Sequence, residues 1–174
     1  LGLIGWHRTP LLTNSNQYHM PTEVFIKDPL IWLDKTSQHR VTTLASPNFG
    51  YKHLLRYFDE ERAEEWDLSS VRIIFNGAEP ISAEIAQHFL DKMSRYGLKE
   101  EPMTPAYGIA EGTLGISFDL PENKFISYSL DRQSLTYKEE IRLIDKDDDD
   151  ATIFVDCGKV VDNCQVRIAD KENN

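Results

Sequence analysis

Helical and extended patterns alternate along the first two-thirds of the chain, and this alternation constrains the fold more than any other feature. The expected elements, in chain order, are a helix from 29, a strand over 41–45, a helix over 51–58, a strand over 71–75, a helix over 82–97 and a strand over 103–107. Strands that are separated by helices pair in parallel, and the helices cover the sheet. We therefore predict an α/β fold with a mostly parallel sheet flanked by helices.

Capping residues mark two of these helices. Asp28 is expected to cap the first, whose opening residue Pro29 is favourable at that position. Ser82 is expected to cap the long amphipathic helix, which Gly97 ends. Residues 47–50 are expected to break the pattern, and the charged residues 59–65 are expected to form a solvated helix end or loop.

The pattern changes after about residue 118. Short β-like runs separated by polar turns follow at 124–130, 141–144, 152–155 and 165–169. The aspartate-rich run 145–150 lacks the glycine and glutamate of a calcium loop, and we interpret it as a solvated loop. We predict a small β-rich attachment, with domains 1–120 and 121–174.

Composition excludes several classes of protein. The 174 residues are 40% apolar and 28% charged, which fits a globular domain. The net charge of −10 argues against a nucleic-acid partner, and no apolar stretch is long enough to span a membrane. Cys157 and Cys164 match no metal or redox spacing, so we expect reduced thiols and a cytoplasmic location.

Two strand ends carry the residues most suited to binding chemistry. Open α/β sheets bind ligands at the carboxyl ends of their strands. The segment 76–80 has two residues with almost no side chain, on whose backbone a flat ring can lie. Tyr107 offers an aromatic face, and Glu111 offers a carboxylate suited to Mg²⁺ beside phosphates. The alternatives are an ordinary turn, a core aromatic and a surface glutamate.

Taken together, the motifs resemble the adenylate-forming ligase superfamily, and within it the fatty acyl-AMP ligases. The likeness runs over essentially the whole chain. The stretches that carry it are Gly2-Leu3-Ile4-Gly5, Met20-Pro21-Thr22, Ser46-Pro47-Asn48-Phe49-Gly50-Tyr51, Trp66-Asp67-Leu68-Ser69-Ser70-Val71-Arg72, Asn76-Gly77-Ala78-Glu79-Pro80 and Tyr107-Gly108-Ile109-Ala110-Glu111.

The resemblance implies roles for single residues. Glu111 looks like the Mg²⁺ ligand and the one catalytic residue of this chain, and Tyr107 looks like the ring that stacks on adenine. The nucleotide-binding residues would be Asn76, Gly77, Ala78, Glu79, Pro80, Tyr107, Gly108 and Ala110. The residues walling the acyl site would be Trp6, Asn48, Phe49, Gly50 and Tyr51, with plain core packing as the alternative for the aromatic ones.

Departures from the wider superfamily narrow the substrate class. Ala110 stands where many relatives have threonine, which fits the fatty acyl-AMP branch. Pro105 stands where amino-acid-activating relatives often have asparagine, so an amino-acid substrate is not expected. Residues 127–135 resemble the start of an insertion that is linked, in fatty acyl-AMP ligases, to failure to use coenzyme A.

The implied activity is ATP-dependent activation of a fatty acid as acyl-AMP, with an acyl carrier protein as acceptor and ATP and Mg²⁺ as cofactors. The phosphate loop and the catalytic lysine of the family have no counterpart in this sequence. We therefore interpret the chain as an internal piece of a larger enzyme and expect it to be inactive alone. The alternatives are a fatty acyl-coenzyme A ligase, a non-catalytic α/β interaction domain and, more remotely, a nucleotide-cofactor oxidoreductase.

Overall fold

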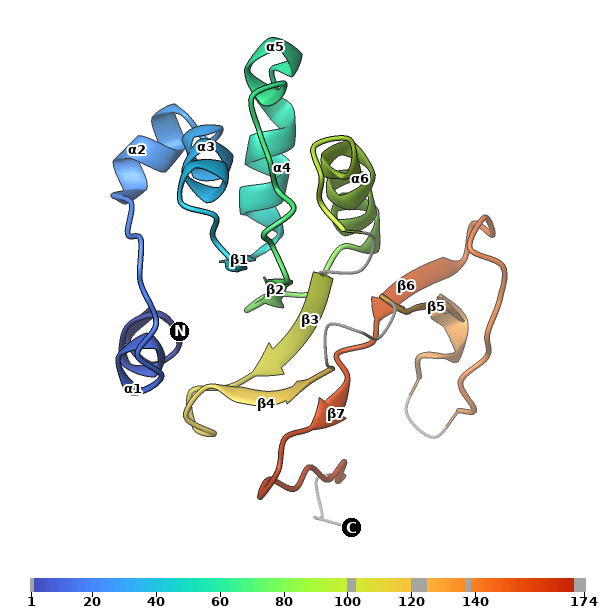
Figure 1. Cartoon of the computed structure of the whole chain (residues 1–174). Coiled ribbons are helices and arrows are strands. Elements are labelled where there is room, and N and C mark those ends of the chain that lie inside the picture. The colour runs from blue at the N-terminus through green and yellow to red at the C-terminus, as the bar shows by residue number, and fades with distance from the viewer. Residues whose placement is uncertain (1, 100–102, 120–124, 137–138, 171–174) are drawn as a thin grey trace.

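A five-stranded sheet of order β1-β2-β3-β4-β7 forms the centre of the molecule (Figure 1). The computed structural model describes residues 2–99, 103–119, 125–136 and 139–170. Strands β1 (Thr43–Ser46), β2 (Ile73–Gly77) and β3 (Met103–Gly108) are parallel, which confirms the predicted pairing. Strands β4 (Gly115–Phe118) and β7 (Lys159–Val160) extend this sheet in antiparallel pairing beyond the three expected strands.

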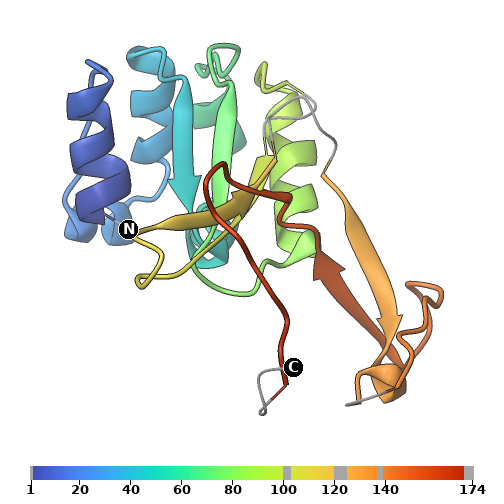
Figure 2. The same cartoon turned by 90° about the horizontal axis from the view of Figure 1, so that it is seen from below.

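The helices lie on two sides of the sheet (Figures 1 and 2). One side carries α2 (Thr22–Lys27), α3 (Ile31–Gln38), α4 (Asn48–Arg56), α5 (Glu60–Ala63) and α6 (Ala83–Ser94). The other side carries the N-terminal segment, a π-helical turn (Ile4–Arg8) that continues into α1 (Thr9–Leu12).

The hydrophobic core lies between the sheet and the helices α3, α4 and α6. On α6, Phe89 and Met93 are four residues apart and both are fully buried, as an amphipathic helix requires. They face the β2 residue Ile74 and the α4 residues Tyr51 and Leu54, which are also fully buried. Each such side chain contributes roughly 1.5–3 kcal/mol by leaving water, so this layer fixes α4 and α6 against the strands.

Two helix starts differ from the sequence predictions. The predicted break at 47–50 is wrong, because Pro47 is the N-cap residue and α4 begins directly after it. The expected cap by Asp28 is also wrong, because α3 begins at Ile31 with Leu30 as its N-cap residue. The predictions for α6 are confirmed: the Ser82 side chain accepts a hydrogen bond from the Ile85 backbone, and Gly97 has a φ of +86°.

Asp28 has a different partner, the guanidinium group of Arg62. Arg62 donates two hydrogen bonds of 2.9 Å to the Asp28 carboxylate and also pairs with Asp34, which accepts a bond from the Trp66 indole. The pKa of Asp28 is lowered, chiefly by its hydrogen bonds from Arg62. The carboxylates of Asp34 and Asp28 in turn raise the pKa of Arg62. This cluster joins α3 to α5, the short helix that forms in the charged stretch.

The C-terminal part is only partly the predicted β-rich attachment. Strands β5 (Ser127–Asp131) and β6 (Ala151–Val155) pair antiparallel beside α6, and a 3₁₀ turn (Arg132–Ser134) follows β5. The run 141–144 forms a single bridge, Leu130 to Leu143, and the strand predicted at 165–169 is wrong because that segment has no strand pairing. β7 returns to the main sheet, where it pairs with β4 (Figure 1). We keep the division at residue 120 as a prediction.

Candidate nucleotide site at the carboxyl ends of the strands

The candidate site lies where β2 and β3 end side by side. Gly77 on β2 pairs in register with Ala106 on β3. Ala78 and Tyr107, the residues that follow this pair, are therefore neighbours at the ends of the two strands. A Cβ atom on Gly77 would lie 2.4 Å from the Ala106 carbonyl oxygen. Only glycine, which has no Cβ atom, avoids this clash. Gly77 therefore permits the close approach of the two strands and sets the adenine-loop candidate 76–80 beside Tyr107.

Asn76 is fully buried at the end of β2. Its side chain has 0% exposure, and neither its amide oxygen nor its amide nitrogen has a hydrogen-bond partner within the described residues. In register it lies between Ser46 on β1 and Pro105 on β3. A buried amide without partners costs free energy, so Asn76 keeps an unused donor and an unused acceptor at the end of β2.

The loop after β2 is held in an uncommon conformation. Ala78 has a φ of +71°, a backbone angle that residues other than glycine rarely adopt. Asn48, the first residue of α4, donates a 2.8 Å bond to the Pro80 carbonyl and accepts a 3.0 Å bond from the Ser82 backbone. Glu79 is exposed. The loop is thus clamped from α4 while the backbone near Ala78 stays open.

Tyr107 and Glu111 belong to the β3–β4 hairpin. Tyr107 is 49% exposed, so its ring is free to stack on a ligand. Gly108 is needed where the hairpin closes, because a Cβ there would lie 1.9 Å from the Leu114 carbonyl oxygen. In the turn that follows, the Ala110 carbonyl accepts a bond from the Thr113 backbone, and the next residue, Glu111, is exposed.

Glu111 fits Mg²⁺ as a single carboxylate ligand. The described residues contain no group of three or more His, Cys, Asp or Glu side chains that could hold a metal. Mg²⁺ typically takes one or two carboxylates and completes its shell with phosphate oxygens and water. Glu111 is an exposed carboxylate in the turn between β3 and β4, close to Tyr107 in sequence. It suits that arrangement, with the nucleotide supplying the other oxygens.

The expected acyl-site residues do not form one surface. Tyr51 is fully buried on the helix side of the sheet, with its ring 5.0 Å from that of Phe89. Trp6 contacts Phe75, with ring centroids 6.0 Å apart. Phe75 alternates along β2 with the buried Ile74, so it points to the opposite face. Trp6 and Tyr51 therefore lie on opposite sides of β2.

Two of the remaining acyl-site residues belong to the first turn of α4. Phe49 is 57% exposed and packs edge-on against Phe25. Gly50 is buried, and a Cβ atom there would lie 1.9 Å from the Ser46 hydroxyl oxygen. Phe49 is therefore open to a ligand, whereas Gly50 sets the approach of α4 to β1.

Sequence reasoning missed a row of aromatic side chains on the side of the sheet that faces away from α4 and α6. Phe75 lies between Trp6 and Phe118, and its ring centroid is 5.9 Å from that of Phe118. The alternation of buried and open positions along β2 could have identified Phe75. Phe118 required knowledge of β4, which follows the β3 hairpin and pairs Phe118 with Ala106.

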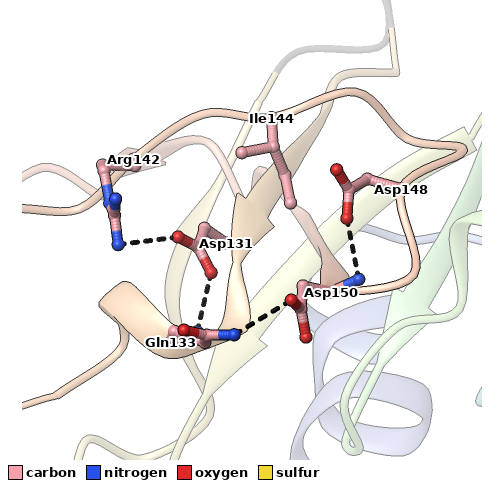
Figure 3. A pocket seen from close by; sticks show the side chains of 6 residues that line it. All are labelled: Asp131, Gln133, Arg142, Ile144, Asp148 and Asp150. Atoms are coloured by element: carbon pink, nitrogen blue, oxygen red, sulfur yellow. Dashed lines mark hydrogen bonds and ion pairs between the residues drawn. The ribbon is translucent and has the colours of Figure 1, made fainter.

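A separate pocket lies in the β5–β6 region (Figure 3). Its polar side chains bind one another: Arg142 pairs with Asp131 at 2.9 Å, and Gln133 donates a 3.0 Å bond to Asp150. The aspartate-rich loop at its rim is exposed and forms local turns, such as the bond from the Asp150 backbone to Asp148. These groups satisfy each other, and we assign the pocket no ligand. The lining residues are Asp131, Gln133, Arg142, Ile144, Asp148 and Asp150.

The family profile described as AMP-binding enzyme matches residues 3–174. The chain belongs to the AMP-binding enzyme family. It is 38% identical over 116 residues, 67% of its length, to a medium-chain-fatty-acid–[acyl-carrier-protein] ligase of Moorena producens. It is 33% identical over 98% of its length to another ligase of that description, from Teredinibacter turnerae. These matches cover 20% and 26% of the two relatives, so the chain spans about a quarter of an AMP-binding enzyme of this kind.

The fold is also that of solved AMP-binding enzymes. The chain superposes with a TM-score of 0.91 and 30% identity on a fatty acid AMP ligase from Legionella pneumophila, covering 98% of this chain and 29% of that one. The predicted α/β architecture with helices flanking a mostly parallel sheet is thereby confirmed. Within the described residues no helix is both long and apolar enough to cross a membrane.

Proposed function

We propose that this chain supplies the adenine-binding wall of an enzyme that activates a fatty acid with ATP. The observation that carries the proposal is the β2–β3 register, which sets the half-buried Gly77 and the exposed Ala78 beside the exposed ring of Tyr107. A flat base fits between a bare backbone and an aromatic face. The named functions of the two bacterial relatives support a fatty acid as the second substrate.

The reaction that fits this site is formation of an acyl adenylate. The fatty acid carboxylate attacks the α-phosphorus of ATP, and pyrophosphate leaves. The thiol of an acyl carrier protein then attacks the acyl carbonyl of acyl-AMP and forms a thioester, and AMP leaves. Mg²⁺ held by Glu111 and phosphate oxygens would supply charge neutralisation on the polyphosphate. The residues of this chain bind and orient the base, and the reacting carboxylate needs groups from elsewhere in the enzyme.

The nucleotide-binding set divides by role. Tyr107 and the backbone of 77–80 would hold the two faces of adenine, and Asn76 would offer its free amide to a ring edge. Gly108 and Ala110 would shape the turn that leads to Glu111.

On the acyl side, we propose that Trp6 and Phe49 contact the acyl chain from separate surfaces, and that Gly50 and Tyr51, which share α4 with Phe49, support Phe49 from the core. Phe49 is exposed, and Trp6 heads the row of Trp6, Phe75 and Phe118. The open aromatic surfaces suit an apolar substrate. Asn48 adjoins this group in sequence, but both ends of its amide are used by the loop after β2.

Three further points remain proposals. The acceptor is a carrier protein, with coenzyme A as the alternative, because residues 127–135 resemble the start of an insertion that is linked to failure to use coenzyme A. This segment forms β5 and the turn after it. The location is cytoplasmic, in keeping with free Cys157 and Cys164. The isolated 174-residue chain is inactive, because the groups that act on the carboxylate lie in other parts of the enzyme.

The test is fatty-acid-dependent exchange of pyrophosphate into ATP by the full-length protein that contains this chain. Exchange that requires a fatty acid and falls at least 100-fold in Glu111→Ala supports the proposal. Glu65→Ala removes an exposed carboxylate just beyond α5 and serves as the matched control. A folded full-length protein that shows no exchange with fatty acids of any length would favour the non-catalytic interaction domain.

A further inference from the structure

The side-chain amide of Asn48 joins two segments that are 32 residues apart in sequence. Its nitrogen donates to the Pro80 carbonyl at 2.8 Å, and its oxygen accepts from the Ser82 backbone at 3.0 Å. Asn48 is the first residue of α4, and Pro80 and Ser82 lie between β2 and α6. Each bond uses a different end of the amide, so the two bonds fix both the position and the orientation of the loop.

The loop that Asn48 holds is the one with the uncommon backbone. Ala78, with a φ of +71°, lies two residues before Pro80. A conformation that costs free energy persists only where its surroundings determine it. Downstream, the Ser82 hydroxyl caps α6 through Ile85 at 3.3 Å. The Asn48 bonds therefore hold the loop at its middle and at its end, between the β2 ladder and α6.

We propose that Asn48 is a positioning residue for the nucleotide, which acts through the loop 77–82 and does not contact the acyl chain. This inference rests on the proposed adenine site. Both ends of the Asn48 amide already bind the loop, and an apolar acyl chain offers an amide no hydrogen-bond partner. By holding the loop open beside Tyr107, Asn48 sets the width of the gap into which the base enters.

A single-atom change separates this role from simple packing. Asn48→Asp keeps an oxygen that accepts from the Ser82 backbone, but it replaces the donor to Pro80 with an oxygen facing a carbonyl oxygen. Asn48→Ala removes both bonds. Asn16→Asp makes the same chemical change at an exposed position between α1 and α2 and is the matched control.

Hydrogen exchange of the full-length protein measures the loop directly and needs no activity. We expect Asn48→Asp and Asn48→Ala to speed exchange about tenfold in peptides covering 77–82, with the β1 peptides and the melting temperature nearly unchanged. Unchanged exchange in 77–82 would overturn the proposal. Global unfolding of both variants would also overturn it, in favour of a role in the fold alone.

Kinetics then separate nucleotide positioning from acyl binding. We expect Asn48→Asp to raise the KM for ATP about tenfold and to change the KM for the fatty acid less than twofold, with Asn16→Asp at wild-type values. A larger effect on the fatty acid KM would overturn the proposal and return Asn48 to the acyl wall. If the wild-type protein shows no exchange activity, the proposed function fails, whereas the hydrogen-exchange result still decides whether Asn48 holds the loop.

Discussion

The phenol of Tyr51 donates a hydrogen bond of 2.9 Å to the backbone carbonyl of Phe75, and so joins α4 to the end of β2. Burial raises the pKa of Tyr51, so the phenol stays protonated and remains a donor. Phe75 is followed directly by Asn76, so this bond fixes the strand end from which the candidate nucleotide loop begins.

Replacing Tyr51 by phenylalanine tests whether this residue is scaffold or acyl wall. We expect Tyr51→Phe to lower the free energy of unfolding by about 1 kcal/mol, because a buried hydrogen bond is lost. The preference for acyl chain length should not change. Tyr57→Phe, at the exposed C-terminal end of α4, is the control with no expected effect. A shift in chain-length preference would place Tyr51 on the substrate, contrary to its full burial.

Asn76→Leu tests whether the free amide serves a ligand. Leucine has a similar shape and no polar atoms, so removing an amide without partners should leave the free energy of unfolding unchanged or raise it by about 1 kcal/mol. Affinity for ATP, measured by calorimetry on the full-length protein, should fall about tenfold. A lower melting temperature with unchanged ATP binding would show instead that the amide serves the fold, through bound water.

The sequence predicted the sheet well because the helix and strand periods alternate clearly up to residue 107. The starts of the helices were harder to predict. Pro47 ends the extended stretch and is also the N-cap residue of α4, and no local sequence signal distinguishes a break from a helix start. The nucleotide loop and Tyr107 could be paired from topology alone, because carboxyl ends of parallel strands meet at one edge.

The missing parts of the site depend on contacts between residues distant in sequence. The partners of Asn48 lie more than 30 residues away, and only the packing of α4 on the sheet brings them together. Likewise, the segment 165–169 alternates correctly but forms no strand pairing with the part of the chain that the structure describes, whereas the two-residue β7 pairs with β4. Alternation predicts a strand only where a free edge is within reach.

Asp28→Asn tests the ion pair with Arg62 through its pH dependence. The pKa of Asp28 is held below its ordinary value of 3.8, chiefly by the Arg62 hydrogen bond. A depressed pKa stabilises the fold above pH 3.8, and this stabilisation is lost as pH falls toward the lower folded-state pKa. We expect the variant to be about 1 kcal/mol less stable at pH 7, because the pair is partly exposed.

The deficit of Asp28→Asn should narrow below pH 3.8, which chemical denaturation at several pH values can follow. Asp149→Asn, in the exposed aspartate-rich loop, is the control. A deficit that stays constant down to pH 2 would mean that Asp28 acts through packing and not through its charge.

Ala78→Val tests whether the loop beside Tyr107 needs its left-handed backbone. Ala78 is exposed, so a larger side chain meets no core, yet a β-branched residue strongly resists a φ of +71°. We expect a loss of about 1–2 kcal/mol in the free energy of unfolding. Glu79→Val makes a β-branched change at the next exposed position, which has no positive φ, and should cost less than 0.5 kcal/mol. Equal losses in both variants would mean that the loop rejects valine for its apolar surface. A loss confined to Ala78→Val would show that the backbone conformation itself is what the loop preserves, as a site that binds a base on bare backbone requires.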